Sequence, residues 1–294
     1  METKKKNTIL VPVDFSDISN HALNNAIKVA MQFKNNIALL HVVEEALMSS
    51  LLSFGKNDEK ESIARQQVNE RLITMAAHIK KENNIDCSTH VRFGRIYKEI
   101  AATADELGCD SIIMGSNGAS GFEQIIGSNA SRTIMHSNVP VVVVKSDRPS
   151  KGYSNIVFPL DLNIESRQKV KWAIHLGKSY QSTIHILTYK VGDEDQNTNM
   201  RAALRQITGL LDAAGVKHTE HVLEYLAEEF PLETIKYAEA INADLILIMS
   251  QLEDMGLSDY IIGTEAQQLV NKSLHIPVMC VRPAKTGISS DFVI

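Results

Sequence analysis

The sequence has few cysteines and no long apolar run. Its three cysteines, Cys87, Cys109 and Cys280, lie far apart in the 294 residues and match no metal-binding spacing. No apolar run approaches the roughly eighteen residues that a membrane-spanning helix requires. The apolar stretch near the N-terminus is also too short for the core of a signal peptide. We therefore expect a cytoplasmic protein with reduced thiols, without a bound metal and without a membrane partner.

The motifs that mark many common enzymes are absent as well. No G-x-G-x-x-G follows the first apolar run, and no GxxxxGK[ST] sequence provides a P-loop lysine. Neither a G-x-S-x-G elbow, nor an HExxH helix, nor a CxxC pair occurs. The net charge of −5 argues against a polyanion-binding surface, and the basic cluster at residues 4–6 is typical of a solvated tail. We expect no nucleic-acid partner.

The chain does contain an internal repeat. TILVPVDFSD near the start and NIVFPLDLNI near the middle both carry a Pro-x-Asp after a β-rich run, so that Asp14 matches Asp161. Later features recur in the same order, including Gly127, which matches Gly263, and a polar segment rich in turn residues separates the two copies. The repeat predicts two tandem domains, which span residues 1–147 and 153–284.

Each copy alternates strand and helix patterns. In the first copy we expect strands near 8–13, 36–43, 86–92, 110–115 and 140–145, and helices near 17–33, 57–83, 95–107 and 128–137. The strands are continuously apolar, as is typical of parallel strands that are covered on both faces. This alternation predicts an open parallel α/β sheet, in which ligands bind beyond the carboxyl ends of the strands.

Two polar residues follow the first two strands. Asp14 could place a carboxylate in the crevice, or it could serve the turn into the following helix, whose better N-cap is Ser16. His41 lies in an apolar strand, where a histidine is more often a satisfied structural residue than a ligand. No second histidine or carboxylate stands at metal-binding spacing from it.

A glycine-rich stretch, GSNGASGFEQIIGS, follows the fourth strand. Gly115 and Gly118 lie where the chain leaves the sheet, so the backbone there could approach a ligand closely. Gly127 and Ser128 then begin a helix, whose first amides are unpaired and whose dipole favours an anion. Taken alone, a glycine-rich turn is a weak sign of a phosphate site.

The chain resembles the universal stress protein family. The resemblance rests on ILVPVDFS at 9–16, LLHV at 39–42, CDSIIMGSNG at 109–118 and IGSNASRTIMHSNVPVVVVK at 126–145, and on a weaker second copy. It implies an α/β fold of two tandem open five-stranded parallel-sheet domains, of the adenine nucleotide alpha hydrolase-like type, with strand order 3-2-1-4-5.

One branch of that family binds ATP through a G-x2-G-x9-G-[ST] motif, and the resemblance implies ATP binding in the first half. ADP or AMP in its place, and an accompanying Mg²⁺, are left open. Between Gly118 and Gly127 the chain has eight residues, ASGFEQII, where the motif has nine. The residues implied in binding the nucleotide are Pro12, Asp14, Val42, Met114, Gly115, Gly118, Gly127, Ser128 and Asn129.

The second copy departs further from the motif. We align Gly115 with Ser250 and Gly118 with Glu253, and a carboxylate at the second position would repel phosphate oxygens. Val42 is replaced by Tyr189. These changes predict that the second half binds no ATP.

The favoured function is that of a nucleotide-binding stress-response or regulatory protein, at most a slow ATPase. The glycine-rich stretch carries no lysine or arginine, and fast phosphoryl transfer needs cationic charge and metal-holding groups. The alternative is a structural or interaction protein that binds no nucleotide and uses the tandem fold as a dimerisation scaffold. An adenylate-forming or sulfur-transfer enzyme is disfavoured, because no S-G-G-x-D-S type loop follows the first strand.

The last strand of each copy is strongly β-forming and would be an exposed edge if left alone. We expect VPVVVVK and IPVMCVR to pair with each other, which makes the chain an intramolecular pseudo-dimer. A homodimer of two chains is left open.

Overall fold

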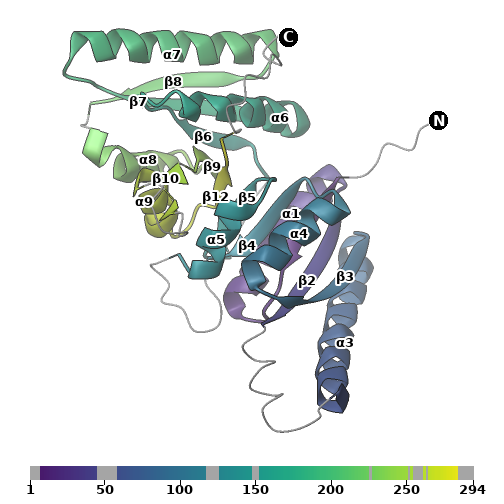
Figure 1. Cartoon of the computed structure of the whole chain (residues 1–294). Coiled ribbons are helices and arrows are strands. Elements are labelled where there is room, and N and C mark those ends of the chain that lie inside the picture. Colours follow the sequence, from purple (N-terminus) through teal and green to yellow (C-terminus); the bar gives the residue numbers. More distant parts are fainter. Residues whose placement is uncertain are drawn as a thin grey trace.

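The computed structural model describes residues 7–44, 58–116, 126–147, 152–224, 227–250, 252–253, 261–262 and 264–283. Two α/β halves follow one another along the chain, and their strands join in one continuous sheet that runs through the molecule (Figure 1).

Strands and helices alternate along the first half, as the sequence predicts. Its elements are β1 (Thr8–Pro12), α1 (Asp17–Phe33), β2 (Asn36–Glu44), α3 (Asp58–Asn83), β3 (Cys87–Gly94), α4 (Ile96–Leu107), β4 (Ser111–Gly115), α5 (Ser128–His136) and β5 (Val141–Val144).

The second half repeats this order. Its elements are β6 (Asn155–Pro159), the 3-10 helix η1 (Glu165–Lys169), α6 (Val170–Tyr180), β7 (Thr183–Tyr189), α7 (Glu194–Ala213), β8 (His218–Leu223), the 3-10 helix η2 (Ala227–Glu229), α8 (Phe230–Ala240), β9 (Leu245–Met249), α9 (Thr264–Lys272) and β12 (Val278–Val281). Two short strands, β10 (Leu252–Glu253) and β11 (Ile261–Ile262), pair antiparallel with each other outside the main sheet.

The ten-stranded sheet has the order β3-β2-β1-β4-β5-β12-β9-β6-β7-β8. Within each half the strands are parallel in the order 3-2-1-4-5, as predicted. The halves meet where β5 and β12 pair antiparallel, with Val142 opposite Met279. The predicted pairing of the two last strands is therefore confirmed, and the sheet is mixed only at this seam.

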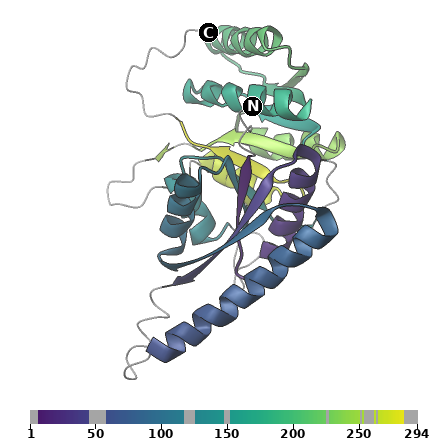
Figure 2. The ribbon, with the colours of Figure 1, turned by 90° about the vertical axis from the view of Figure 1, so that its right-hand side faces the viewer.

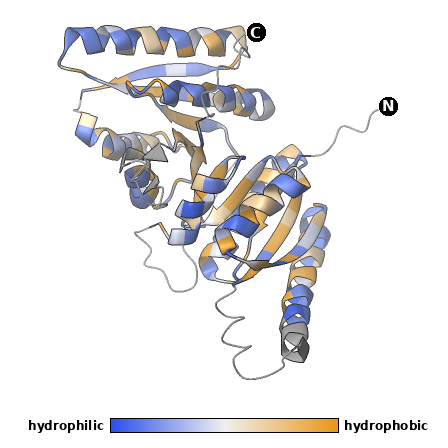
Figure 3. Cartoon of the chain, in the orientation of Figure 1, coloured by the Kyte–Doolittle hydropathy of each residue, from blue (hydrophilic) through white to orange (hydrophobic). Residues whose placement is uncertain are grey.

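Helices cover both faces of the sheet. In the first half α1 packs beside α3 on one face and α4 packs beside α5 on the other, and in the second half α6 packs beside α7 and α8 beside α9 (Figures 1 and 2). The inner strands are apolar along most of their length, the edge strand β8 is largely polar, and the helices alternate apolar and polar residues (Figure 3). Residues such as Leu10 and Ile112 are completely buried. Burial on both faces is why the strands read as continuous apolar runs.

The two helices that border the strand ends begin differently. At α1, the Ser16 hydroxyl accepts the Ser19 amide as an N-cap. At α5, the N-cap residue is Gly127 and no side chain caps the helix. The first amides of α5 are therefore left for another partner.

Within the described ranges, no helix combines the length and apolar character that crossing a membrane requires. Cys87, Cys109 and Cys280 are all free thiols.

Candidate functional site

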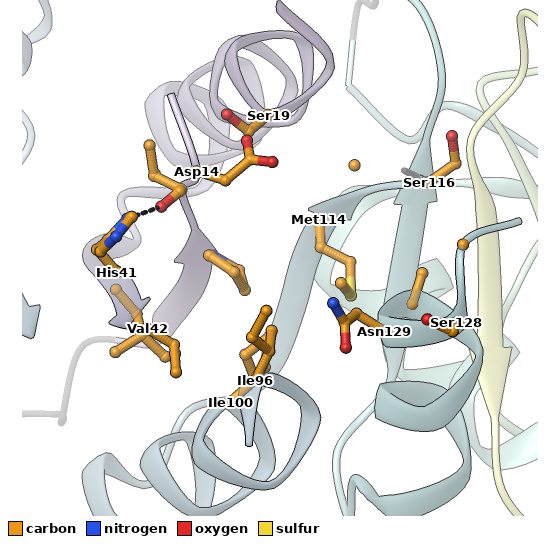
Figure 4. Close-up of a pocket in the computed structure, with 16 residues that line it drawn as sticks. Asp14, Ser19, His41, Val42, Ile96, Ile100, Met114, Ser116, Ser128 and Asn129 are labelled. Atoms are coloured by element: carbon orange, nitrogen blue, oxygen red, sulfur yellow. Dashed lines mark hydrogen bonds between the residues drawn. The ribbon is translucent and has the colours of Figure 1, made fainter. Parts of the chain in front are cut away.

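A pocket of about 270 Å³ opens at the carboxyl ends of β1, β2 and β4, beside the N-terminus of α5. It lies where the strand order reverses between β1 and β4, the usual ligand position in an open α/β sheet. Figure 4 shows Asp14 and Ser19 on one side of this first-half pocket, Ser128 and Asn129 on the other, and Met114 between them. All the sequence-predicted residues that the structure describes line it: Pro12, Asp14, Val42, Met114, Gly115, Gly127, Ser128 and Asn129. Gly118 lies outside the described residues.

Asp14 follows β1, and its carboxylate forms the turn into α1. Its Oδ1 accepts hydrogen bonds from the Ser16 amide (3.0 Å) and the Ser16 hydroxyl (2.6 Å). Partial burial acts to raise the pKa of Asp14, but hydrogen bonds from Ser16 and Ser19 outweigh it, so the pKa lies below its usual value. The two roles that the sequence left open for Asp14 thus coincide: a charged carboxylate is held by the turn and lines the pocket.

His41 also lines the first-half pocket. Its Nδ1 lies 2.7 Å from the Val13 carbonyl oxygen, and its ring stacks on Phe15 with 5.0 Å between the centroids (Figure 4 draws the hydrogen bond). The expectation of a histidine with satisfied hydrogen bonds is therefore confirmed, and it joins the ends of β1 and β2.

The N-terminus of α5 is fixed to the end of β4. The Gly127 amide donates to the Ser116 carbonyl at 2.8 Å, and the Gly127 carbonyl accepts the first helical hydrogen bond from Ser131 at 3.0 Å. The intervening amides, including those of Ser128 and Asn129, have no partner inside the helix, because the amides of a first helical turn never do. The helix dipole adds a partial positive charge at the same point.

Ser116 is a pocket residue that the sequence analysis missed. Its side chain is buried, lines the first-half pocket, and has an Oγ without a hydrogen-bond partner within the described part of the chain. A buried hydroxyl without a partner is costly, so its presence beside a pocket points to a ligand that completes it. Ser116 directly follows β4, so the strand-end rule could have identified it.

The apolar wall of the first-half pocket comes partly from α4. Ile96 and Ile100 lie on the first turn of that helix and line the pocket with Val42 (Figure 4). Sequence reasoning missed both isoleucines, because α4 is distant from the other pocket segments along the chain and only the sheet brings it there.

Gly115 has a packing role at this site. A Cβ at this position would lie 2.7 Å from Ile18 Cγ2 and 3.2 Å from the Ile18 backbone. The missing side chain therefore lets α1 approach β4 closely. The close approach of the Gly115 backbone to a ligand stays a prediction.

The alignment of Gly115 with Ser250 was wrong by one residue. In the sheet, Ser116 N donates to Val144 O at 3.0 Å and Ser250 N donates to Val281 O at 2.8 Å, so the two serines are equivalent. From Ser116 to Gly127 the chain advances 11 positions, whereas from Ser250 to Gly263 it advances 13, so the first half is two residues shorter here and spacing alone does not fix the alignment. Ser250 Oγ donates to Val281 O at 3.1 Å, whereas Ser116 Oγ has no such partner among the described residues.

The equivalent pocket of the second half is much smaller, about 30 Å³, and is lined by Pro159 and Asp161. Lys169 fills its inner end. This side chain is 2% exposed, and its Nζ donates to the Pro159 carbonyl and to the Ser166 hydroxyl, both at 2.6 Å. The repeat places Ala22 at the same position in the first half.

Aromatic and sulfur-containing side chains occupy more of the second-half pocket region. Tyr189, which replaces Val42, packs on Phe230 with 4.8 Å between ring centroids, and Phe230 replaces Ile96. Met249, which stands where the first half has Gly115, also lines the small pocket. Glu253, Asp254 and Gly263 carried part of the sequence argument, but the Glu253 side chain and the other two residues lie outside what the structure describes.

The charged groups around the first-half pocket are few. Among its lining residues, all within the described ranges, there is no lysine or arginine. No group of three or more metal-ligating side chains occurs among the described residues. The first backbone amides of α5 lie on one side of the pocket, and the Asp14 carboxylate, a hydrogen-bond acceptor, lies on the other.

This fold and pocket define a class: tandem α/β domains joined in one sheet, with a ligand-sized pocket at the switch point of the first. The model of the universal stress protein family matches residues 6–145 and 152–282. The chain belongs to the universal stress protein family.

The universal stress protein G relatives each match about half of this chain, whereas one solved structure matches nearly all of it. Universal stress protein G of Escherichia coli O157:H7 is 38% identical over 144 residues, which cover 47% of this chain and 98% of that protein. Universal stress protein G of Shigella flexneri is 37% identical over 143 residues, 47% of this chain and 97% of that protein. The crystal structure of a universal stress protein from Archaeoglobus fulgidus DSM 4304 covers 95% of this chain and 100% of its own, with a TM-score of 0.74 and 20% identity. This last similarity shows that the tandem fold is shared.

Proposed function

We propose that the first half, residues 1–147, binds an adenine nucleotide and that the protein acts as a nucleotide-binding regulatory member of its family. The observation that carries the proposal is one pocket that combines the charged Asp14, the first amides of α5, which have no partner inside the helix, and the Ser116 hydroxyl, which has no partner among the described residues. These groups suit the two polar ends of a nucleotide, its ribose and its phosphates.

The chemistry of each lining residue suits a particular part of the nucleotide. Asp14 can accept hydrogen bonds from ribose hydroxyls, and Val42 with the α4 isoleucines offers an apolar wall for the base. Gly127, Ser128 and Asn129 present backbone amides where phosphates would bind. The number of phosphates is not fixed by these contacts, so ATP, ADP and AMP all remain candidates.

Binding of this kind does not imply fast turnover. Backbone amides can bind phosphate without accelerating its transfer, because such binding need not favour the transition state over the bound substrate. Rapid phosphoryl transfer also uses cationic side chains, and the described lining of the pocket contains none. We therefore expect tight binding with hydrolysis that is negligible in a single-turnover assay; rapid, saturable turnover abolished by Asp14→Ala would contradict a regulatory role.

The second half, residues 153–284, is proposed to bind no nucleotide. Lys169 and the Tyr189–Phe230 pair fill the volume that remains open in the first half. The second half then serves as a partner for the sheet of the first half.

The proposal is tested by mass spectrometry of the small molecules that the full-length protein carries through purification, in wild type and in Gly118→Glu. This substitution introduces into the glycine-rich stretch the carboxylate that the second half has at Glu253. Wild type should release an adenine nucleotide on acid denaturation, and the variant should release much less. Equal nucleotide in both proteins would refute the site assignment. No nucleotide in wild type, with no thermal shift on adding ATP and magnesium, would favour the scaffold function.

A further inference from the structure

A residue of the second half contacts the backbone at the entrance of α5. Asn271, in the last turn of α9, accepts a hydrogen bond on its side-chain Oδ1 from the Ile126 amide at 2.8 Å. Ile126 is buried and immediately precedes Gly127, the N-cap residue of α5. The first-half pocket is thus bordered by a backbone segment that the other half holds.

Asn271 is itself fixed by the first half. Its backbone carbonyl accepts a hydrogen bond from Lys145 Nζ at 2.7 Å, just beyond the end of β5. Helices α5 and α9 lie near the β5–β12 seam, and β11 of the second half packs against α5 (Figure 1). The contacts between the two halves at the β5–β12 seam therefore fix the position of Asn271.

Two successive amides at the start of α5 are committed to defined partners. Ile126 N donates to Asn271, and Gly127 N donates to the Ser116 carbonyl at 2.8 Å. These two hydrogen bonds orient the peptide groups that follow. The next amides, those of Ser128 and Asn129, are in the first turn of α5 and have no partner inside the helix. Because no side chain of α5 caps that turn, Asn271 supplies an orienting contact that the first half lacks.

Among the described residues, no side chain of α5 makes the corresponding hydrogen bond to the second half. Aligning Ser128 with Thr264 places Met135 of α5 at the position of Asn271. A thioether is only a weak hydrogen-bond acceptor, so Met135 cannot hold the equivalent second-half backbone in the same way. The larger pocket, that of the first half, is therefore the one whose border is held by a side chain of the other half.

We propose that Asn271 is a positioning residue for the phosphate end of the first-half pocket, through which the second half sets the nucleotide affinity of the first. The proposal rests on the proposed function, since it assumes that the α5 amides bind phosphate. It assigns the second half a role beyond that of a sheet partner: changes in its position at the seam are transmitted to the pocket through this hydrogen bond.

The test is titration calorimetry of full-length Asn271→Ala with ATP and, separately, with adenosine. Loss of one orienting hydrogen bond should weaken ATP binding about threefold to tenfold. Adenosine, which has no phosphate to reach α5, should bind as it does to wild type. Amide hydrogen exchange without ligand gives a second readout, in which the Ile126 amide should exchange faster in the variant.

Two further variants separate positioning from general damage. Asn271→Asp keeps an acceptor oxygen and should restore slow exchange at Ile126. Asn138→Ala removes a different asparagine hydrogen bond of equal length, 2.8 Å to Asp105, outside the pocket lining, and should leave ATP affinity unchanged.

The outcomes distinguish the two proposals. Wild type that binds ATP and Asn271→Ala that binds it equally well would overturn the positioning role alone. An equal loss for ATP and adenosine would also overturn it, because the damage would then not be confined to the phosphate end. If wild type binds neither ligand, the proposed function fails and the positioning role fails with it.

Discussion

At the scale of single residues, the most informative comparison is between Ser116 and Ser250. Both follow the fourth strand of their half and donate the same backbone hydrogen bond to the neighbouring strand. Their hydroxyls differ: Ser250 Oγ bonds to Val281 O, whereas Ser116 Oγ has no partner in the described ranges and lines the open pocket. The repeat thus contains its own control for a ligand-directed side chain.

Ser116→Ala should therefore affect ligand binding and not folding. The substitution removes no hydrogen bond seen in the part of the chain that the structure describes, so the free energy of unfolding should stay the same or rise, while ATP affinity should fall about threefold to tenfold. Urea unfolding and calorimetry with ATP measure the two effects.

Ser250→Ala is the matched control with the opposite pattern. It removes a buried hydrogen bond, so it should destabilise the protein by about 0.5–1.5 kcal/mol and leave ATP affinity unchanged. A Ser116→Ala variant that is destabilised as much as Ser250→Ala, with normal ATP affinity, would show that the Ser116 hydroxyl serves the fold.

Which residues the sequence could identify depends on how local their signals are. Asp14 and Ser128 were predicted because each stands directly after a strand or at a helix start, a position that the chain itself marks. Ile96 was missed because it reaches the pocket only through packing of α4 on the sheet. Lys169 was missed because a lysine in a helical pattern is normally exposed, and only the structure shows it buried in the second-half pocket.

At the scale of elements, the position of α1 on the sheet depends on Gly115. The absent Cβ leaves room for Ile18, and α1 carries Ser19 and the cap that holds Asp14. The packing of this helix therefore sets one side of the first-half pocket.

Gly115→Ala should push α1 away from β4. The added Cβ would lie 2.7 Å from Ile18 Cγ2, closer than atoms tolerate, and overpacking of this kind costs about 1–3 kcal/mol. Thermal and urea unfolding measure the loss, and adding Ile18→Ala should recover part of it.

Gly209→Ala in α7 is the matched control. A Cβ there meets nothing within 4 Å, so the change should raise the free energy of unfolding by about 0.5–1 kcal/mol through helix propensity. Equal stability of Gly115→Ala and wild type would contradict the packing role of Gly115.

Element boundaries were predicted well because strand and helix periodicities are local, and strands buried on both faces give continuous apolar runs. The alignment of the two halves after the fourth strand was less secure. The backbone hydrogen bonds of the sheet show that Ser116 and Ser250 are equivalent, whereas the spacing from each serine to the following matched glycine differs by two residues between the halves.

At the scale of the whole molecule, the two halves are joined by more than the strands of the seam. Lys145 donates to the Asn271 carbonyl at 2.7 Å, and Arg282 donates to the Ser137 carbonyl at 3.2 Å. Each cation follows the last strand of one half and contacts the end of a helix of the other half, where the helix dipole favours positive charge. The sequence predicted the strand pairing from exposed β-forming edges, but these contacts depend on how the helices lie across the seam.

The burial of Lys145 at this seam makes stability depend on pH in a defined range. Desolvation lowers the pKa of Lys145 from 10.5 to about 8. Between these values the unfolded chain binds more protons than the folded chain at this site, so the free energy of unfolding rises with pH. Below about pH 8 the lysine is charged in both states and contributes no slope.

The expected result is a difference in Tm between wild type and Lys145→Arg that is constant below about pH 8 and grows in favour of wild type up to about pH 10. Arginine keeps its charge throughout this range, so the variant lacks the titration while other groups titrate as in wild type. Calorimetry at a series of pH values measures it. A difference that stays flat across the range would show that Lys145 titrates as an exposed lysine does and that its ammonium is not desolvated where the two halves meet.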